Sequence, residues 1–307
     1  MIDPVRSVPS LKVGASSAGG GAAGAGGGAS DASGGAAGAS EVTLRAVPEE
    51  VPVALVYDGS TQAVMMATPA DLEDFAVGFS FTEGQISSPA DITELSIVEQ
   101  SDGIEARMWL VPEAGQHLAS RRRAIAGPTG CGLCGVESLA AAVPPPPVVP
   151  QGLVITRDDV HRALTALAPA QELNIRTRAV HAAAFFTPAT GALVVREDVG
   201  RHNALDKLVG AVLRSGAAAD AGFVVLTSRV SVEMVQKTAK LGAQVIVAVS
   251  APTALALRTA EAAGITLIAI ARADGFEIFT HPHRIAVSQP NTAGAGPTPG
   301  TEARHAR

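Results

Sequence analysis

Three short, almost uninterrupted apolar segments stand out in the second half of the chain. They occupy residues 223–226, 244–249 and 266–270. Such segments are typical of strands covered by helices on both faces of a sheet. The intervening segments have helical spacing, and each ends before a glycine, Gly242 or Gly264, where a left-handed helix cap is expected. This alternation of strands with helices at 232–241 and 254–263 predicts a layered α/β domain.

The first half of the chain has shorter and less regular segments. Strands are predicted at 51–56, 63–66, 96–98 and 105–111, and a helix at 71–79. Four consecutive prolines at 144–147 cannot continue a helix and divide the folded part in two. We therefore expect an α+β protein overall, with a smaller mixed domain over 41–143 and an α/β domain over 144–288.

Both ends of the chain lack the pattern of a folded segment. Residues 14–40 are Gly, Ala or Ser at every position except Asp31. Such a composition buries too little apolar surface to offset the entropy of ordering the backbone. Residues 289–307 show no hydrophobic periodicity. We predict disordered tails at 1–40 and 289–307.

Composition narrows the class of protein. The 307 residues carry 23 basic and 29 acidic side chains, which gives a net charge of −6 and argues against general nucleic-acid binding. No run of 18 apolar residues occurs, and the first residues lack the basic and apolar pattern of an export signal. We expect a cytoplasmic protein with neither a nucleic-acid nor a membrane partner.

The only two cysteines, Cys131 and Cys134, lie in the glycine-rich segment Gly127-Pro-Thr-Gly-Cys-Gly-Leu-Cys-Gly135. Thiolate is the reactive form of cysteine, and nearby cations such as the arginines at 121–123 favour it. A structural zinc site would need a second pair of ligands, and none has the matching spacing. A thioredoxin-like redox pair would follow a strand and begin a helix, whereas this pair precedes the α/β half. Persulfide transfer remains, and composition alone does not establish it.

Polar residues cluster at the start of a further predicted helix. The segment Arg196-Glu-Asp-Val-Gly-Arg-His202 follows an apolar strand and precedes a helix at 203–213. Backbone N–H groups at a helix start bind phosphate, and the guanidinium fork of Arg201 matches phosphate geometry. The alternative is structural, with Asp198 capping the helix and Arg201 paired with a carboxylate. Both interpretations can hold together.

Three further sites carry candidate chemistry. Ser228 and Arg229 follow the strand at 223–226, at the carboxyl edge where α/β sheets bind ligands. His202 and Asp206 are one helical turn apart and could form a polarised pair, although such pairs are often only surface contacts. His181 lies in an apolar segment, where a histidine more often lines a core or cavity.

Four motifs together are specific to one family. They are Thr129-Gly-Cys-Gly-Leu-Cys-Gly-Val-Glu137, Arg196-Glu-Asp-Val-Gly-Arg-His-Asn-Ala-Leu-Asp-Lys207, Ser228-Arg-Val-Ser-Val-Glu-Met-Val-Gln-Lys237 and Thr280-His-Pro-His-Arg284. With them, residues 51–287 resemble the FdhD family of formate dehydrogenase accessory sulfurtransferases. The resemblance implies a second domain similar to the layered α/β fold of cytidine deaminase. It does not imply deamination, because that chemistry needs His-x-Glu at the metal and this chain has His181-Ala-Ala183.

The resemblance also implies a function and partners. Family members relay sulfur from a cysteine desulfurase to the molybdenum cofactor, bis(molybdopterin guanine dinucleotide), before it enters formate dehydrogenase. On that pattern Cys131 would carry the persulfide, Cys134 would assist, and the protein would be a homodimer that binds the cofactor as its substrate. The matching cofactor segment is Ile270, Ala271, Arg272, Ala273, Asp274 and Gly275, to which we add Ser228, Arg229, Arg201 and His202.

This chain departs from the family pattern at three positions. Relatives can have an aromatic residue at the position of Ile270 and a basic one at that of Gly275, and glycine is commoner at that of Arg178. These departures leave Arg272 as the side chain of residues 270–275 that is expected to contact the cofactor. Two other functions stay open: a cofactor-binding chaperone that does not need the cysteines, and a metal-binding regulatory module. We predict no metal site.

Overall fold

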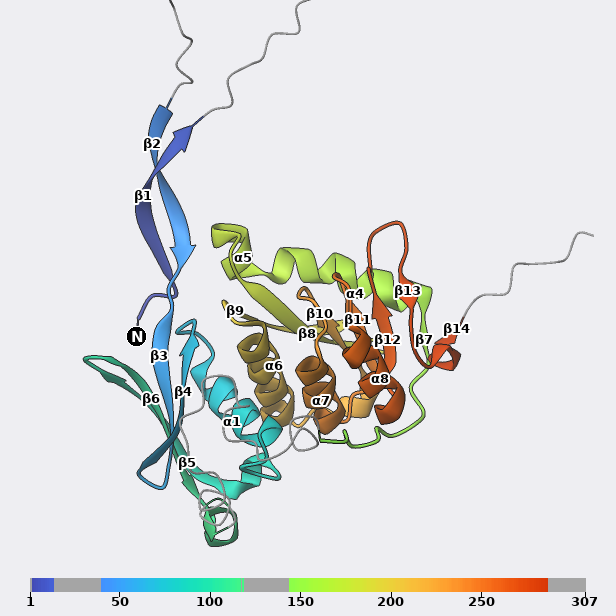
Figure 1. Ribbon diagram of the computed structural model, residues 1–307, viewed down its shortest axis with the longest axis horizontal. Helices are drawn as coiled ribbons and strands as arrows, with labels where there is room; N and C mark the ends of the chain where they lie inside the picture. Colours follow the sequence, from blue (N-terminus) through green and yellow to red (C-terminus); the bar gives the residue numbers. More distant parts are fainter. Residues whose placement is uncertain (1, 14–39, 117, 119–143, 287–307) are drawn as a thin grey trace, which may run out of the picture.

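The computed structural model describes residues 2–13, 40–116, 118 and 144–286. They form a mixed α/β structure with a four-stranded and a six-stranded sheet, as Figure 1 shows. The predicted fold class is therefore confirmed. The likeness to cytidine deaminase and the two domain boundaries stay predictions. Among the described residues, no helix is long and apolar enough to cross a membrane.

The four-stranded sheet belongs to the first half of the chain and has the order β4-β3-β6-β5. Its strands are β3 (Val51–Tyr57), β4 (Ser60–Ala67), β5 (Ile92–Gln100) and β6 (Gly103–Leu110). Strands β3 and β6 are parallel, and the other neighbours are antiparallel. Helix α1 (Leu72–Thr82) covers one face and buries Phe75 in the same cluster as Tyr57 and Met108. The turn η1 (Pro89–Asp91) leads into β5.

The six-stranded sheet has the order β13-β12-β11-β10-β8-β9. Its strands are β8 (His181–Thr187), β9 (Ala192–Asp198), β10 (Phe223–Leu226), β11 (Val245–Ala248), β12 (Thr266–Ala269) and β13 (Glu277–Ile278). The three central strands β10, β11 and β12 are parallel, whereas β8, β9 and β13 join through antiparallel pairs. Every residue of the central strands is buried, as their apolar sequences predict.

Helices cover both faces of this sheet. On one face lie α6 (Arg201–Ser215), α7 (Val232–Leu241) and α8 (Ala254–Ala263). On the other lies α4 (Arg157–Ala170), followed by α5 (Glu172–Thr177). The remaining short elements are β7 (Ile155–Thr156), β14 (Ile285–Ala286), η2 (Ala219–Ala221) and η3 (Pro282–Arg284).

Helices α7 and α8 have the predicted bounds. Gly242 and Gly264 follow them with φ of 89° and 72°, in the left-handed region that glycine adopts without strain. The three predicted apolar strands differ from the observed β10, β11 and β12 by one residue at each end or less. Local pattern and caps therefore determine these elements.

The two halves of the chain are joined by close packing of α1 on α6 (Figure 1). A Cβ atom added to Gly78 on α1 would lie 1.7 Å from the carbonyl oxygen of Asp206 on α6. One added to Gly210 would lie 1.9 Å from the carbonyl oxygen of Asp74. Both glycines are therefore required for the two backbones to approach this closely.

Residues 5–13 differ from the prediction of a disordered tail over 1–40. Strand β1 (Val5–Val13) pairs antiparallel with β2 (Ser40–Pro48), with Val5 opposite Pro48 and Pro9 opposite Leu44. The tail prediction is wrong for β1, because its pairing partner lies beyond the Gly, Ala and Ser segment and no local pattern identifies it. Residues 14–39 lie outside the described residues.

Candidate functional site

The candidate site lies at the carboxyl edge of the six-stranded sheet. We define this edge as residues 227–231, 249–253 and 270–275, with the amino end of β8 and the first turn of α6. Backbone hydrogen bonds hold the loops together: Val249 N–H donates to Leu226 O over 2.9 Å, and Ala271 N–H to Ala248 O over 3.0 Å. Strand β9 runs in the same direction as β10, so α6 also begins at this edge. This is the edge that binds ligands in α/β proteins.

Ser228 and Arg229 lie in the loop after β10, as predicted. Ser228 is buried and its hydroxyl donates to the carbonyl of Arg229 over 3.2 Å, whereas the Arg229 side chain is exposed. Val230 N–H donates to Ala251 O and so ties this loop to the one after β11. A fixed backbone thus presents the Arg229 guanidinium to solvent at the edge.

The loop after β12 contains the predicted cofactor segment. Ile270 has φ of 53°, a left-handed conformation that is strained for a β-branched residue, and its side chain is 37% exposed. Arg272 donates from Nη1 to Val249 O over 2.5 Å, and its N–H donates to Gly275 O over 2.8 Å. The Arg272 side chain therefore braces the loop after β11. In the same loop, Ala271 is buried, while Ala273 and Asp274 are exposed.

Arg201 and His202 form the first turn of α6. Within the described part of the chain, Arg201 Nε and His202 Nε2 are buried atoms without a hydrogen-bond partner. The nearest carboxylate to His202 is Glu233 in the first turn of α7, with Nε2 and Oε2 3.9 Å apart. No carboxylate pairs with Arg201 among the residues described, so the predicted ion pair is not observed. Two unpaired nitrogen atoms at one helix start can receive an acceptor oxygen of a ligand.

Two histidines at this edge are held neutral. Burial, and then the positive charge of Arg201, lower the pKa of His202 below its usual value of 6.5, and Glu233 raises it by less. Burial and Arg201 likewise lower the pKa of His181, which begins β8. A neutral imidazole can donate from one nitrogen and accept at the other. The edge therefore has arginine cations and neutral histidines side by side.

The predicted pair of His202 with Asp206 is wrong. Asp206 is buried at the junction of α1, α6 and α7, where its two carboxylate oxygens lie 2.9 and 3.0 Å from Lys237 Nζ. Thr82 Oγ1 donates to the same carboxylate over 2.6 Å. Asp206 therefore serves the packing between helices, and Glu233 takes the place beside His202.

The prediction that Asp198 caps the helix is wrong, because the N-cap of α6 is Gly200 and, in the described structure, no backbone N–H of the first turn donates to the side chain of Asp198. Asp198 has a different structural role. Asp198 is fully buried, accepts from Gly200 N–H over 2.7 Å and from Thr68 N–H over 3.0 Å, and pairs with Lys207 Nζ at 2.7 Å. It thus holds the residue that precedes α6 and joins it to the first half of the chain. Sequence reasoning missed Lys207 and Thr68, because nothing in their local pattern links them.

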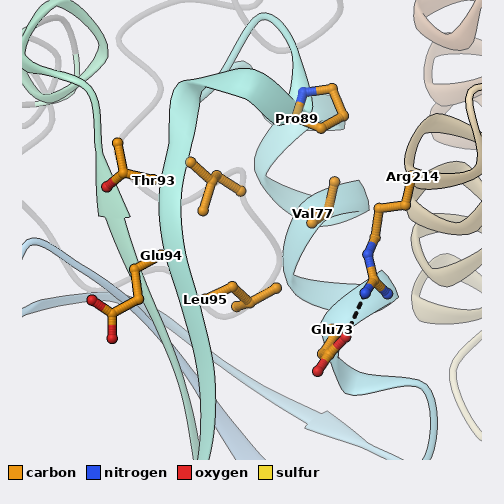
Figure 2. A pocket seen from close by; sticks show the side chains of 8 residues that line it. Glu73, Val77, Pro89, Thr93, Glu94, Leu95 and Arg214 are labelled. Atoms are coloured by element: carbon orange, nitrogen blue, oxygen red, sulfur yellow. Dashed lines mark hydrogen bonds and ion pairs between the residues drawn. The ribbon is translucent and has the colours of Figure 1, made fainter.

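A cavity of about 270 Å³ lies elsewhere, between α1, β5 and the end of α6. Figure 2 shows Arg214 reaching from α6 to Glu73 on α1 beside it. Arg214 also contacts Asp74 over 2.5 Å, so its charge is matched by two carboxylates. None of the predicted site residues lines this cavity.

Cys131 and Cys134 lie outside the described residues, as do the arginines at 121–123.

Comparison with known proteins agrees with the motifs. The model of the FdhD/NarQ family matches residues 48–286. The chain belongs to the FdhD/NarQ family. A sulfur carrier protein FdhD from Agrobacterium fabrum is 57% identical over 246 residues, covering 78% of this chain and 89% of the relative. The protein of that name from Cupriavidus necator is 50% identical over 239 residues, covering 78% and 83%.

A solved structure shares the fold. The crystal structure of a formate dehydrogenase accessory protein from Desulfotalea psychrophila superposes with a TM-score of 0.64 at 24% sequence identity. The match covers 91% of this chain and 99% of that one. The two proteins therefore share the arrangement of sheets and helices described above.

Proposed function

We propose that this FdhD/NarQ protein is a sulfur carrier that serves the maturation of formate dehydrogenase. The observation that carries the proposal is the identity of 57% with a sulfur carrier protein over 246 residues, joined to a matched family range that includes Cys131 and Cys134. In this proposal a cysteine desulfurase supplies the sulfur, and the acceptor is bis(molybdopterin guanine dinucleotide), bound as substrate. The protein would act in the cytoplasm as a sulfurtransferase and as a homodimer.

Sulfur transfer to Cys131 is a displacement at sulfur. The Cys131 thiolate attacks the terminal sulfur of the donor's persulfide, a new S–S bond forms, and the donor's cysteine leaves as thiolate. In the second step the acceptor supplies an electron pair to the terminal sulfur, a bond between acceptor and sulfur forms, the S–S bond breaks, and Cys131 leaves as a thiolate. Cys134 would assist this cycle.

The carboxyl edge would hold the nucleotide end of the cofactor. The exposed guanidinium of Arg229 and the unpaired Nε of Arg201 suit phosphate oxygens. His202, neutral and without a hydrogen-bond partner at Nε2 in the described structure, can donate to or accept from the same ligand. Ile270 would offer an apolar contact where relatives can have an aromatic side chain.

Intact-protein mass spectrometry after incubation with a cysteine desulfurase and cysteine tests the carrier role. An added mass of about 32 Da, one sulfur atom on a thiolate, is expected in the wild type and in Cys134→Ala. It should be absent in Cys131→Ala, which serves as the matched variant in the same loop. Absence of added sulfur in the wild type would contradict the carrier role and favour a cofactor-binding chaperone that does not need its cysteines.

Calorimetric titration with GDP, as a probe of the guanine nucleotide end, tests the edge. Arg229→Ala and Arg201→Ala should each weaken GDP binding about tenfold, which is roughly 1.4 kcal/mol and typical of one lost phosphate contact. Arg157→Ala, on α4 across the sheet, is the control and should bind like the wild type. Equal affinities in all four proteins would show that the nucleotide does not bind at this edge.

A further inference from the structure

Helices α6 and α7 pack side by side and bring an imidazole and a carboxylate together at the carboxyl edge (Figure 1). His202 lies in the first turn of α6 and Glu233 in the first turn of α7. His202 Nε2 and Glu233 Oε2 are 3.9 Å apart, which is too far for a hydrogen bond. The two side chains are 36% and 46% exposed. They therefore stand next to each other without satisfying each other, where a ligand can approach them.

The carboxylate is ionised and the imidazole neutral near pH 7. Burial would raise the pKa of Glu233, but contact with the Ser231 hydroxyl and with its own backbone N–H lowers it below the usual 4.5. Burial and the charge of Arg201 lower the pKa of His202. A neutral imidazole donates from one nitrogen, and an ionised carboxylate accepts at two oxygens. The pair thus offers one donor and two acceptor oxygens side by side.

Glu233 makes this point of the edge unsuitable for a phosphate group. A carboxylate repels a phosphate and has no hydrogen atom to donate to it. The exposed guanidinium of Arg229, in the loop before α7, is the phosphate contact in the proposed function. The ligand group beside Glu233 must instead donate hydrogen bonds to a carboxylate and accept one from an N–H group.

We propose that Glu233 and His202 recognise the ring edge that guanine and pterin share. In both rings a carbonyl oxygen, a ring N–H and an exocyclic amine follow one another. The ring N–H and the amine donate to the two oxygens of Glu233. The carbonyl oxygen accepts from His202 Nε2, an atom without a hydrogen-bond partner in the described structure. This inference rests on the proposed function, whose cofactor contains both rings, and it adds the residue that selects them.

The place of Glu233 along the edge suits a ligand that also reaches residues 270–275. That segment follows β12 and α7 follows β10, with β11 between the two strands. Neighbouring strands are about 4.8 Å apart, so the two places are roughly 10 Å apart. A nucleotide can span this distance and a single phosphate cannot. One ligand can therefore contact the expected cofactor segment and present its ring edge to Glu233.

A purely structural role for Glu233 makes a different prediction. An acidic side chain in the first turn of a helix interacts favourably with the helix dipole. That role needs the negative charge but no ligand. Neutralising Glu233 would then lower stability and leave the choice of ligand unchanged, whereas ring recognition makes the choice of ligand depend on Glu233.

Calorimetric titration of the full chain with GDP and with IDP tests recognition of guanine. IDP differs from GDP only by lacking the exocyclic amine. The wild type should bind GDP about tenfold more tightly, as expected for one hydrogen bond to a charged group. Glu233→Gln should lose most of this preference, because an amide has a single acceptor oxygen. Glu172→Gln, an exposed position on α5, is the matched control and should keep it.

His202→Ala separates recognition of the carbonyl oxygen from that of the amine. GDP and IDP both have the carbonyl oxygen, so this variant should weaken both by a similar factor, up to about tenfold. The ratio of the two affinities should stay that of the wild type. A variant that binds both nucleotides as tightly as the wild type would refute the contact of His202 with the carbonyl.

Pterin and lumazine, followed by their own fluorescence, test the other ring. Lumazine has an oxygen atom in place of the exocyclic amine of pterin. A preference for pterin that Glu233→Gln loses would assign the pterin end to Glu233, and the same pattern with GDP and IDP would assign the guanine end. The inference is overturned if the wild type has neither preference, or if Glu233→Gln keeps the preferences of the wild type. GDP binding and sulfur loading that remain intact would then leave the proposed function standing.

Discussion

Arg178 shows how one residue can depart from a family pattern at a local cost. It follows α5 with φ of 58°, in the left-handed region, and its N–H donates to Asn174 O. A side chain in this conformation costs about 1–2 kcal/mol. Glycine avoids this strain but loses more backbone entropy on folding, so only part of the gain remains. This geometry explains why the resemblance favours glycine at the position.

Replacing Arg178 by glycine should therefore stabilise the fold. We expect Arg178→Gly to raise the free energy of unfolding by about 0.5–1 kcal/mol, measured by urea denaturation. Arg176→Gly, inside α5, is the control and should lower it by up to about 1 kcal/mol, because glycine is a poor helix former. A loss of stability in Arg178→Gly would mean that the arginine side chain makes contacts that outweigh the strain.

Only part of the side-chain arrangement at the carboxyl edge could be predicted from the sequence. Arg201 and His202 could be placed because a strand, a glycine and a helix in succession locate a helix start. The partner of His202 could not, since Glu233 lies on another helix and Asp206 has the right local spacing but faces Lys237. Spacing along one helix predicts which residues share a face, and tertiary packing decides which of them is buried.

At the scale of elements, the contact of α1 with α6 depends on two glycines. Helices α1 and α6 are buried over most of their length, and only glycine at 78 and 210 lets their backbones meet. We expect Gly78→Ala to lower the free energy of unfolding by more than about 2 kcal/mol, because its Cβ would have to displace a whole helix. Thermal denaturation measures the effect.

A glycine with open space around its Cα atom supplies the control for this prediction. Gly275 has a backbone that other residues can adopt, and a Cβ atom added to it would have nothing within 4 Å. Gly275→Ala should change the midpoint by no more than a degree or two. Similar losses in Gly78→Ala and Gly275→Ala would show that the helices can move apart at little cost.

Elements whose ends are marked by nearby residues can be predicted from the sequence. Elements that form only by pairing with distant segments cannot. The glycine caps set the ends of α7 and α8, and burial on both faces marks β10, β11 and β12. Strand β1 depends on pairing with β2 across a long segment without pattern, so the chain around it gave no local signal. The antiparallel direction of β8 against β10 is likewise a long-range property.

At the scale of the whole molecule, buried charges join the two halves of the chain. Lys207 and Asp198 are both fully buried, and Lys207 Nζ also donates to Thr68 O over 2.9 Å. Lys237 links Asp206 on α6 with Glu83 at the end of α1. Burying such pairs costs desolvation free energy, and their geometry fixes one relative placement of the elements they join. Asp198 therefore connects the fold of the first half to the helix start that carries Arg201 and His202.

Stability of the whole molecule should depend on pH through the two histidines of the edge. Burial and Arg201 lower the pKa of His181 and of His202 below 6.5 in the folded protein. As pH falls below about 6.5, the unfolded chain binds protons on both imidazoles before the folded chain does, so the unfolded state gains stability. The melting temperature should therefore drop between about pH 7.5 and about pH 5.5, the range that brackets the ordinary pKa of histidine.

The double variant His181→Asn with His202→Asn removes this proton uptake and should show a smaller drop over the same interval. Glu197 and Asp206, whose pKa values burial raises, act in the opposite sense, because their folded forms bind protons first as pH falls. Both carboxyls are present in wild type and variant, so their contribution cancels in the difference between the two melting curves. An equal drop in the two proteins would mean that neither imidazole is held neutral, and that the edge offers protonated histidines, rather than neutral ones, to an anionic ligand.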